Sequence, residues 1–165
     1  MIVDFRKKKN IKESIHVDGN PVEKVRSFKL LGTTVTEDLS WHQNSVLLLK
    51  KARQRLFFLR TLKSYRVQTQ ILTQFYHAII ESALTYSVIV WCGDVTQKDM
   101  HRLNSVVETA KRIIGLDVPQ LREIYEKRIR SRARAIIEDK SHPANHYFEH
   151  LQESAIEHLK EKIDY

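Results

Sequence analysis

Two histidine-containing segments have spacings that could bind a metal ion. His16-Val17-Asp18 matches the H-x-D half of a 2-His-1-carboxylate iron site, which a distal histidine would complete. Asp18-Gly19 is, however, the strongest hairpin-turn signal in the chain, and it places His16 on the strand before the turn. A pattern for the many-stranded barrel of such an oxygenase is missing. The hairpin turn is therefore the favoured interpretation.

The second segment places His142, His146 and His150 at four-residue intervals, which would bring them to one face of a continuous helix. Acidic residues lie nearby, at Glu149, Glu153 and Glu157. We expect Pro143 to leave His142 outside the helix, and an exposed polar face explains the pattern without a metal. We therefore predict no metal ion and no cofactor.

The chain contains few residues and motifs that could carry out catalysis. Cys92 follows Trp91 among apolar neighbours with no base nearby in sequence, which indicates a buried packing thiol. Phosphate-binding glycine motifs do not occur, and neither do paired carboxylates that could hold Mg²⁺. The sequence predicts a binding module with no catalytic residues, not an enzyme.

Basic residues form the most informative pattern. Residues 1–134 carry 25 basic and 13 acidic side chains, a net charge of +12, whereas residues 135–165 carry 3 and 7, a net charge of −4. Residues 39–80 contain no Asp or Glu, and a second basic cluster spans residues 122–134. The candidate nucleic-acid-binding residues are those of the acid-free stretch: Lys50, Lys51, Arg53, Arg55, Arg60, Lys63 and Arg66. Such surfaces attract polyanions such as nucleic acid, and a solvated basic helix face is the alternative.

The elements that position these residues change type near residue 39. Before it, short apolar runs and turn residues predict a small antiparallel sheet, with strands in residues 1–5, 14–17, 22–25 and 28–35. Gly32 lies inside the last run, where a glycine often marks a bulge or a close backbone approach.

After residue 39 the spacing of apolar residues predicts five helices, at residues 40–63, 68–91, 96–114, 119–138 and 145–163. Ser40 and Gln43 fit a capping box for the first helix, and Gly93 and Gly115 are expected to end the second and third. The first helix has an apolar arc that we expect to be buried: Leu48, Leu49, Ala52, Leu56 and Leu59.

The second helix is more apolar and is the expected centre of the bundle. Its apolar residues are Ile71, Leu72, Phe75, Ile79, Ala83, Tyr86 and Val90. The predicted fold class is α+β and mostly α, with a small N-terminal antiparallel β piece followed by a bundle of four to five helices.

Composition supports an ordered protein. Of its 165 residues 42% are apolar, and only 4 are Gly and 3 are Pro, which disfavours disorder and collagen-like structure. A single Cys excludes an internal disulfide and favours a reducing compartment, so we expect an intracellular protein, in the nucleus or cytoplasm. No secretory signal is recognised, and the longest uncharged apolar run, residues 82–92, is too short to span a bilayer, so no membrane partner is expected.

Several segments together resemble the end of the reverse transcriptase of LINE-type (non-LTR) retrotransposons, over about residues 1 to 150. Residues 28–32, FKLLG, are similar to the F-x-x-L-G primer grip of that family, and DLSW at 38–41 with RLFFLR at 55–60 resembles its first thumb helix. The resemblance implies a palm-end piece at residues 1–38, a thumb-like bundle at 39–140 and an acidic helix at 141–165. It also implies that Phe28, Leu31 and Gly32 form a primer-grip hairpin, while the basic residues of the first helix follow the phosphate backbone of a template–primer duplex.

The carboxylate motifs of that family do not occur in the chain, so the resemblance implies a truncated, catalytically inactive module with weak, sequence-independent affinity for RNA or DNA duplexes. Two alternatives stay open. One is a protein-interaction fragment that self-associates through surfaces normally covered by palm and fingers. The other is a protein related to the N-terminal domain of AlkB homologue 8. Similar fragments of reverse transcriptases are assigned to that domain. This relation implies 2-oxoglutarate-dependent oxidoreductase and methyltransferase activity, with iron bound by His16 and Asp18.

Overall fold

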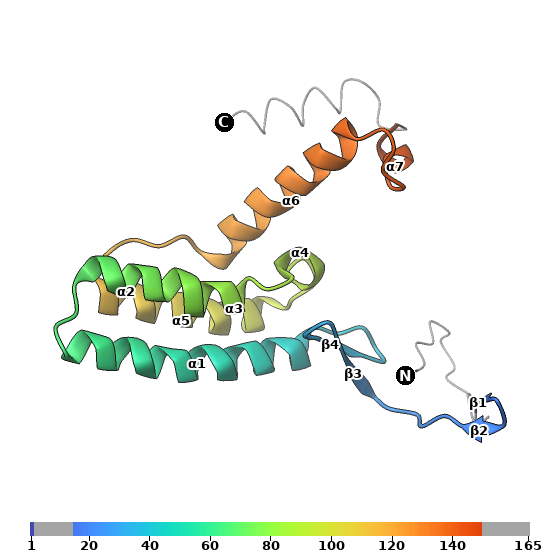
Figure 1. The fold of residues 1–165 in the computed structure, drawn as a ribbon, viewed down its shortest axis with the longest axis horizontal. Coiled ribbons are helices and arrows are strands. Elements are labelled where there is room, and N and C mark those ends of the chain that lie inside the picture. The colour runs from blue at the N-terminus through green and yellow to red at the C-terminus, as the bar shows by residue number, and fades with distance from the viewer. Residues whose placement is uncertain (2–14, 150–165) are drawn as a thin grey trace. The chain divides into compact units, whose positions relative to one another are not determined.

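The computed structural model describes Met1 and residues 15–149. The chain divides into two compact units, Met1–Leu121 and Arg122–Tyr165. Helices predominate, and the strands form two small antiparallel hairpins before the first helix (Figure 1). The predicted fold class is therefore confirmed, whereas the domain boundaries after residues 38 and 140 stay a prediction.

Both hairpins have two-residue turns with left-handed backbone. In the first, β1 (His16–Val17) pairs with β2 (Asn20–Pro21) around the predicted Asp18-Gly19 turn, whose φ angles are 49° and 77°. Positive φ at both positions is the geometry that matches the twist of hairpin strands. The turn is thus confirmed, but residues 22–25 form no strand, and residues 2–5 lie outside the described part of the chain.

The second hairpin corrects the sequence interpretation. Residues 28–35 were expected as one strand, but β3 (Ser27–Leu30) and β4 (Thr33–Thr36) pair with each other, with Leu30 opposite Thr33. Leu31 and Gly32 form the turn, with φ angles of 46° and 87°.

Helix α1 (His42–Ser64) follows and buries the arc that the sequence predicts. The predicted capping box is wrong: Trp41 is the N-cap, and no side chain caps the helix. Ser40 instead belongs to the preceding turn, where its amide donates to Asp38 and its carbonyl accepts from Thr36.

The second predicted helix is not continuous. It divides into α2 (Thr69–Phe75), the π-helix η1 (Tyr76–Glu81), α3 (Ser82–Leu84) and, after a turn, α4 (Val88–Trp91). Ser87 in that turn has a left-handed φ of 49°, which breaks the helix. The chain stops being helical at Trp91, before Gly93.

Only part of the apolar surface of this broken helix is buried. Of the apolar residues named for it, Leu72 is buried, whereas Ile71, Ile79, Tyr86 and Val90 are exposed. The apolar residues that are buried along it are Leu72, Tyr76, Ile80, Leu84, Val88 and Trp91.

Helices α5 (Gln97–Ile114) and α6 (Leu121–Glu138) lie close to their predicted bounds. Thr96 caps α5 by accepting from the amide of Asp99, and Gly115 ends the helix with a left-handed φ of 85°. Of the last predicted helix, α7 (His146–Glu149) is seen, and residues 150–163 lie outside the described part.

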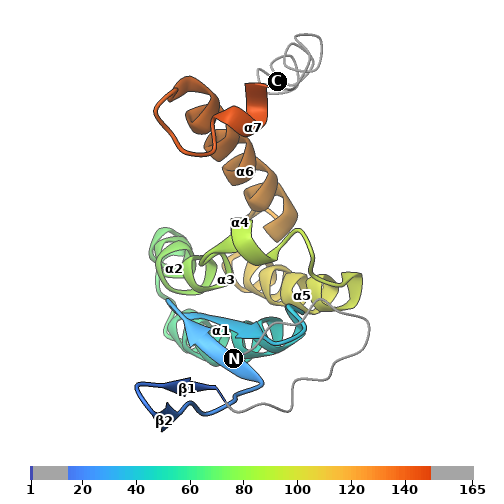
Figure 2. The same cartoon turned by 90° about the vertical axis from the view of Figure 1, so that its right-hand side faces the viewer.

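The core of the first unit lies between α1 on one side and α2, α3 and α5 on the other, as both views show (Figures 1 and 2). Trp91 is fully buried and donates its indole N–H to the carbonyl of Tyr86 at 2.9 Å. Cys92 is buried too, as expected for a packing thiol. One face of α1 is thus fixed to the core while the opposite face is left outside it.

Candidate nucleic-acid interface

Six of the seven candidate basic residues lie on α1, and their placement follows from which arc of the helix is buried. Because residues three and four apart share a face, the surface opposite the buried arc consists of two adjacent rows. Row A is Val46, Lys50, Arg53, Phe57, Arg60 and Ser64. Row B is Leu47, Lys51, Gln54, Phe58, Thr61 and Tyr65. These two rows are called the outer face of α1 below.

The outer face is basic and open. Lys50, Lys51, Arg53 and Arg60 are exposed, and α1 contains no acidic residue that could neutralise them. Within residues 15–149, no ion pair involves any of these four side chains. Four cations are therefore available to an external anion.

Arg55 and Lys63 lie elsewhere on the helix. The Arg55 guanidinium is half-buried and donates to the carbonyl of Ile79, so that it ties α1 to the π-helix. Lys63 is exposed near the end of α1, away from both rows. Nucleic-acid binding by these two residues stays a prediction.

Arg66 ends α1. The amide of Arg66 donates to the Lys63 carbonyl, and the amide of Val67 donates to the Leu62 carbonyl, which is the Schellman pattern of helix ends. Arg66 takes the left-handed position of that motif, with φ 57°, where glycine is usual. Its side chain is exposed beyond the end of α1.

Sequence reasoning missed the importance of two outer-face phenylalanines. Phe57 and Phe58 are 63% and 54% exposed, and their rings meet edge to face, with centroids 5.8 Å apart and planes at 74°. The signal was present, because both residues fall outside the correctly predicted apolar arc. Exposed aromatic rings between unpaired cations are a combination found at nucleic-acid surfaces.

The residues of the predicted primer grip lie together on the β3–β4 hairpin. Phe28 is on β3 and Leu31 and Gly32 form the turn, with Leu31 83% exposed. The Tyr86 hydroxyl donates to the Leu31 carbonyl at 2.5 Å. A Cβ on Gly32 would stand 3.0 Å from the Tyr86 ring, so it is a side chain that lies close to Gly32, not another backbone segment.

The hairpin is also joined to α1. The Thr34 amide, on β4, donates to the buried Asn44 side chain at 3.2 Å. Thr33 and Thr34 are themselves buried, since β4 packs against α1. The hairpin and the outer face of α1 are therefore parts of one framework.

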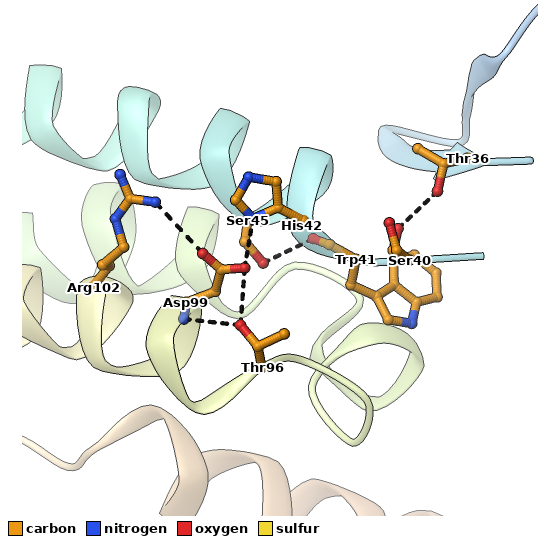
Figure 3. A network of polar contacts seen from close by, with 8 residues as sticks. All are labelled: Thr36, Ser40, Trp41, His42, Ser45, Thr96, Asp99 and Arg102. Carbon is orange, nitrogen blue, oxygen red and sulfur yellow. Dashed lines mark hydrogen bonds and ion pairs between the residues drawn. The ribbon is translucent and has the colours of Figure 1, made fainter. Parts of the chain in front are cut away.

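A polar network fixes the start of α1 to the start of α5 (Figure 3). His42 Nδ1 lies 2.7 Å from Asp99 Oδ2, Thr96 donates to the same oxygen at 3.1 Å, and Arg102 lies 3.6 Å from Oδ1. Burial acts to raise the pKa of Asp99, but the hydrogen bonds from His42 and Thr96 outweigh it and hold the pKa below its usual value. The network gives α1 a defined orientation, which a rigid interface needs.

The second basic cluster lies on α6. Its basic residues are exposed, but Glu126 lies 3.6 Å from both Arg122 and Arg130 and reduces the positive charge of that face. Helix α6 is thus a weaker candidate for anion binding than α1.

The histidines considered as metal ligands do not form a site in the described residues. His16 lies on β1 and Asp18 in the turn after it. His142 lies outside the helix, as Pro143 predicts, and accepts from the Ala144 amide. His150, Glu153 and Glu157 are outside the described residues. In the part of the chain that the structure describes, no three His, Cys, Asp or Glu side chains are grouped as metal ligands.

Among the described residues, no helix is both long and apolar enough to cross a membrane.

Comparison with known proteins gives one match. Residues 41–82 match the family described as alkylated DNA repair protein alkB homolog 8, N-terminal. The matched segment covers about a quarter of the chain and contains all of α1 and η1, but neither His16 nor Asp18. No curated protein and no solved structure matches the chain.

Proposed function

We propose that this protein is a non-catalytic module that binds nucleic acid through phosphate contacts of the outer face of α1. The observation that carries the proposal is a 23-residue helix with six basic and no acidic residues, four of whose cations are exposed together without ion-pair partners among the described residues. Lys and Arg contacts to phosphates supply affinity without reading sequence. The resemblance to a reverse-transcriptase thumb makes a template–primer duplex of RNA or DNA the expected ligand, in the nucleus or cytoplasm.

The dependence of affinity on salt tests this proposal. Each phosphate neutralised on a duplex contributes about −0.9 to the slope of log affinity against log salt, so four outer-face cations predict a slope of about −3.6. Fluorescence anisotropy of a labelled duplex, between about 50 and 200 mM salt, measures it. A flat salt response, or no binding at all, would refute the proposal.

Neutralising single cations locates the interface. Lys50→Gln should weaken binding and reduce the magnitude of the slope by about 0.9. Lys98→Gln is the matched control, because Lys98 is exposed on α5 rather than on α1. Equal effects of the two substitutions would show that net charge, not the outer face of α1, attracts the ligand.

The family match favours a second candidate function, an AlkB-type oxygenase. The matched residues contain neither predicted iron ligand, His16 or Asp18. The match therefore supports a relation to the N-terminal domain of alkB homolog 8 more than it supports oxygenase activity. Titration with Fe²⁺ and 2-oxoglutarate, followed by calorimetry, tests this alternative. It requires binding that His16→Ala and Asp18→Ala abolish.

A further inference from the structure

The outer face of α1 is apolar as well as basic. Val46 and Leu47 are each 41% exposed, and Phe57 and Phe58 are more exposed still. A helix that packs one face on a core usually carries polar residues on the other. Helix α1 instead alternates apolar groups with cations on the side away from its core.

The two phenyl rings have different orientations. Phe57 belongs to row A and Phe58 to row B, and their planes are inclined by 74°. Because the rings meet edge to face, each leaves a face free for another planar group, and the two free faces point in different directions. Two planar groups could stack on both rings only if they were themselves inclined to each other and not parallel.

Cations lie within one helical turn of the rings. Arg53 and Arg60 are four residues before and three residues after Phe57, in the same row. A helix rises 1.5 Å per residue, so these two guanidinium groups start from positions about 10 Å apart along α1, with the phenyl rings between them. One pair of rings thus lies between positive charges along the helix.

We propose that Phe57 and Phe58 stack on unpaired bases, and hence that the ligand of this face includes single-stranded nucleotides. The inference rests on the proposed function and deepens it. A nucleotide brings one planar ring and one negative charge, which complements a pair of rings flanked by cations on α1. In a duplex the base faces are stacked on each other, whereas a single strand can turn successive bases outward. An apolar protein surface would cover Lys50, Arg53 and Arg60 without neutralising them, at a cost in desolvation.

Binding of a labelled oligothymidine of about 16 nucleotides, compared with an abasic strand of equal length and with a duplex, tests the inference. Base–aromatic stacking predicts that Phe57→Ala and Phe58→Ala each weaken oligothymidine binding at least about fivefold and change abasic-strand and duplex binding less than about twofold. Both side chains are exposed, so these substitutions leave the core intact.

Conservative variants separate stacking from apolar contact. Phe57→Trp should retain the affinity for oligothymidine, while Phe57→Leu should lose as much as Phe57→Ala, because leucine keeps the apolar surface but has no π face. Tyr147→Ala is the control, since Tyr147 is an aromatic residue of α7 that is 71% exposed. It should leave binding unchanged.

The outcomes distinguish failure of base stacking from failure of nucleic-acid binding, the proposed function on which stacking rests. Equal affinity of the wild-type protein for oligothymidine and abasic strands, or full affinity of Phe57→Leu, overturns the stacking inference while salt-dependent duplex binding upholds the proposed function. Absence of any nucleic-acid binding overturns both. Self-association that Phe57→Ala abolishes, with no nucleic-acid binding, would show that this face binds a second copy of the chain.

Discussion

Substitution of Gly32 by alanine should disturb the hairpin in a way that the structure allows to be quantified. Gly32 has φ 87°, and an added Cβ would stand 3.0 Å from Cε1 and 3.4 Å from the hydroxyl oxygen of Tyr86. Tyr86 is half exposed, so its ring can move away. Movement would, however, break the hydrogen bond from Tyr86 to the Leu31 carbonyl.

The expected magnitude has two parts. Left-handed backbone costs an L-residue about 1–2 kcal/mol, reduced by about 0.4–1 kcal/mol because alanine also restricts the unfolded chain. Loss of the Tyr86 hydrogen bond adds about 1 kcal/mol. Gly32→Ala should therefore lower the free energy of unfolding by about 2 kcal/mol.

Gly115 provides a matched control. Its φ of 85° is nearly the same, but no atom lies within 4 Å of the position that its Cβ would occupy. Gly115→Ala should thus cost only the backbone part, about 1 kcal/mol. Urea unfolding followed by circular dichroism gives both values, and hydrogen exchange of the Thr34 amide reports separately on docking of the hairpin.

A double-mutant cycle isolates the contact with Tyr86. In the Tyr86→Phe protein the hydrogen bond is already lost, so Gly32→Ala should cost no more than Gly115→Ala does. If Gly32→Ala costs the same with and without the hydroxyl, or never costs more than Gly115→Ala, then the close approach of Tyr86 does not hold the hairpin.

Three further substitutions test other parts of the structure. Asp99→Asn should destabilise the protein by about 1–3 kcal/mol at neutral pH. Because the pKa of Asp99 is lowered in the folded state, its stabilisation is complete above the unfolded value of 3.8 and is lost as pH falls below it. The difference between wild type and Asp99→Asn in urea unfolding should accordingly vanish in strong acid. Arg66→Gly should stabilise the protein by about 0.5–1 kcal/mol, since glycine relieves left-handed strain, and a lower thermal midpoint would contradict this. Tyr76→Phe should raise stability by about 1 kcal/mol, because the buried hydroxyl has no hydrogen-bond partner among the described residues; a loss of stability would indicate a partner.

Helix bounds were predictable where all their signals are local. Thr96 caps α5 and Gly115 ends it, and each acts through hydrogen bonds within one turn of the helix. Ser40 carries a similar signal but does not cap α1, because Asp38 and Thr36 engage its backbone in the turn before the helix. Two local structures competed for the same residue, and sequence spacing alone could not rank them.

The β3–β4 hairpin could not be predicted from its turn. Leu31-Gly32 lacks the Asn-Gly or Asp-Gly signal, and leucine disfavours the left-handed φ that it adopts. The contact that supports this turn comes from Tyr86, 55 residues away along the chain. Stabilisation of a turn by a distant residue cannot be recognised from the residues of the turn and its strands.

The candidate interface was predictable in composition but not in arrangement. The basic residues follow from the sequence, and so does the buried arc of α1. The exposure of Phe57 and Phe58, and the contact that takes Arg55 to the Ile79 carbonyl, depend on which elements pack beside α1. A helical periodicity identifies a core face but does not show what covers the remaining surface.

The π-helix η1 adjusts the direction in which side chains point along the helical run from α2 to α3. Its buried apolar residues recur at every fourth position from Leu72 to Leu84. On an α-helix each four-residue step passes a full turn by about 40°, so three such steps would carry Leu84 to a different side from Leu72. Wider π turns hold more residues and return the rotation. Because η1 accommodates about one residue more than α-helical turns would, deleting one residue from Tyr76–Glu81 should return the segment to a regular α-helix and leave Leu84 facing the core. The π-helix thus accepts an extra residue without changing which side chains face the core.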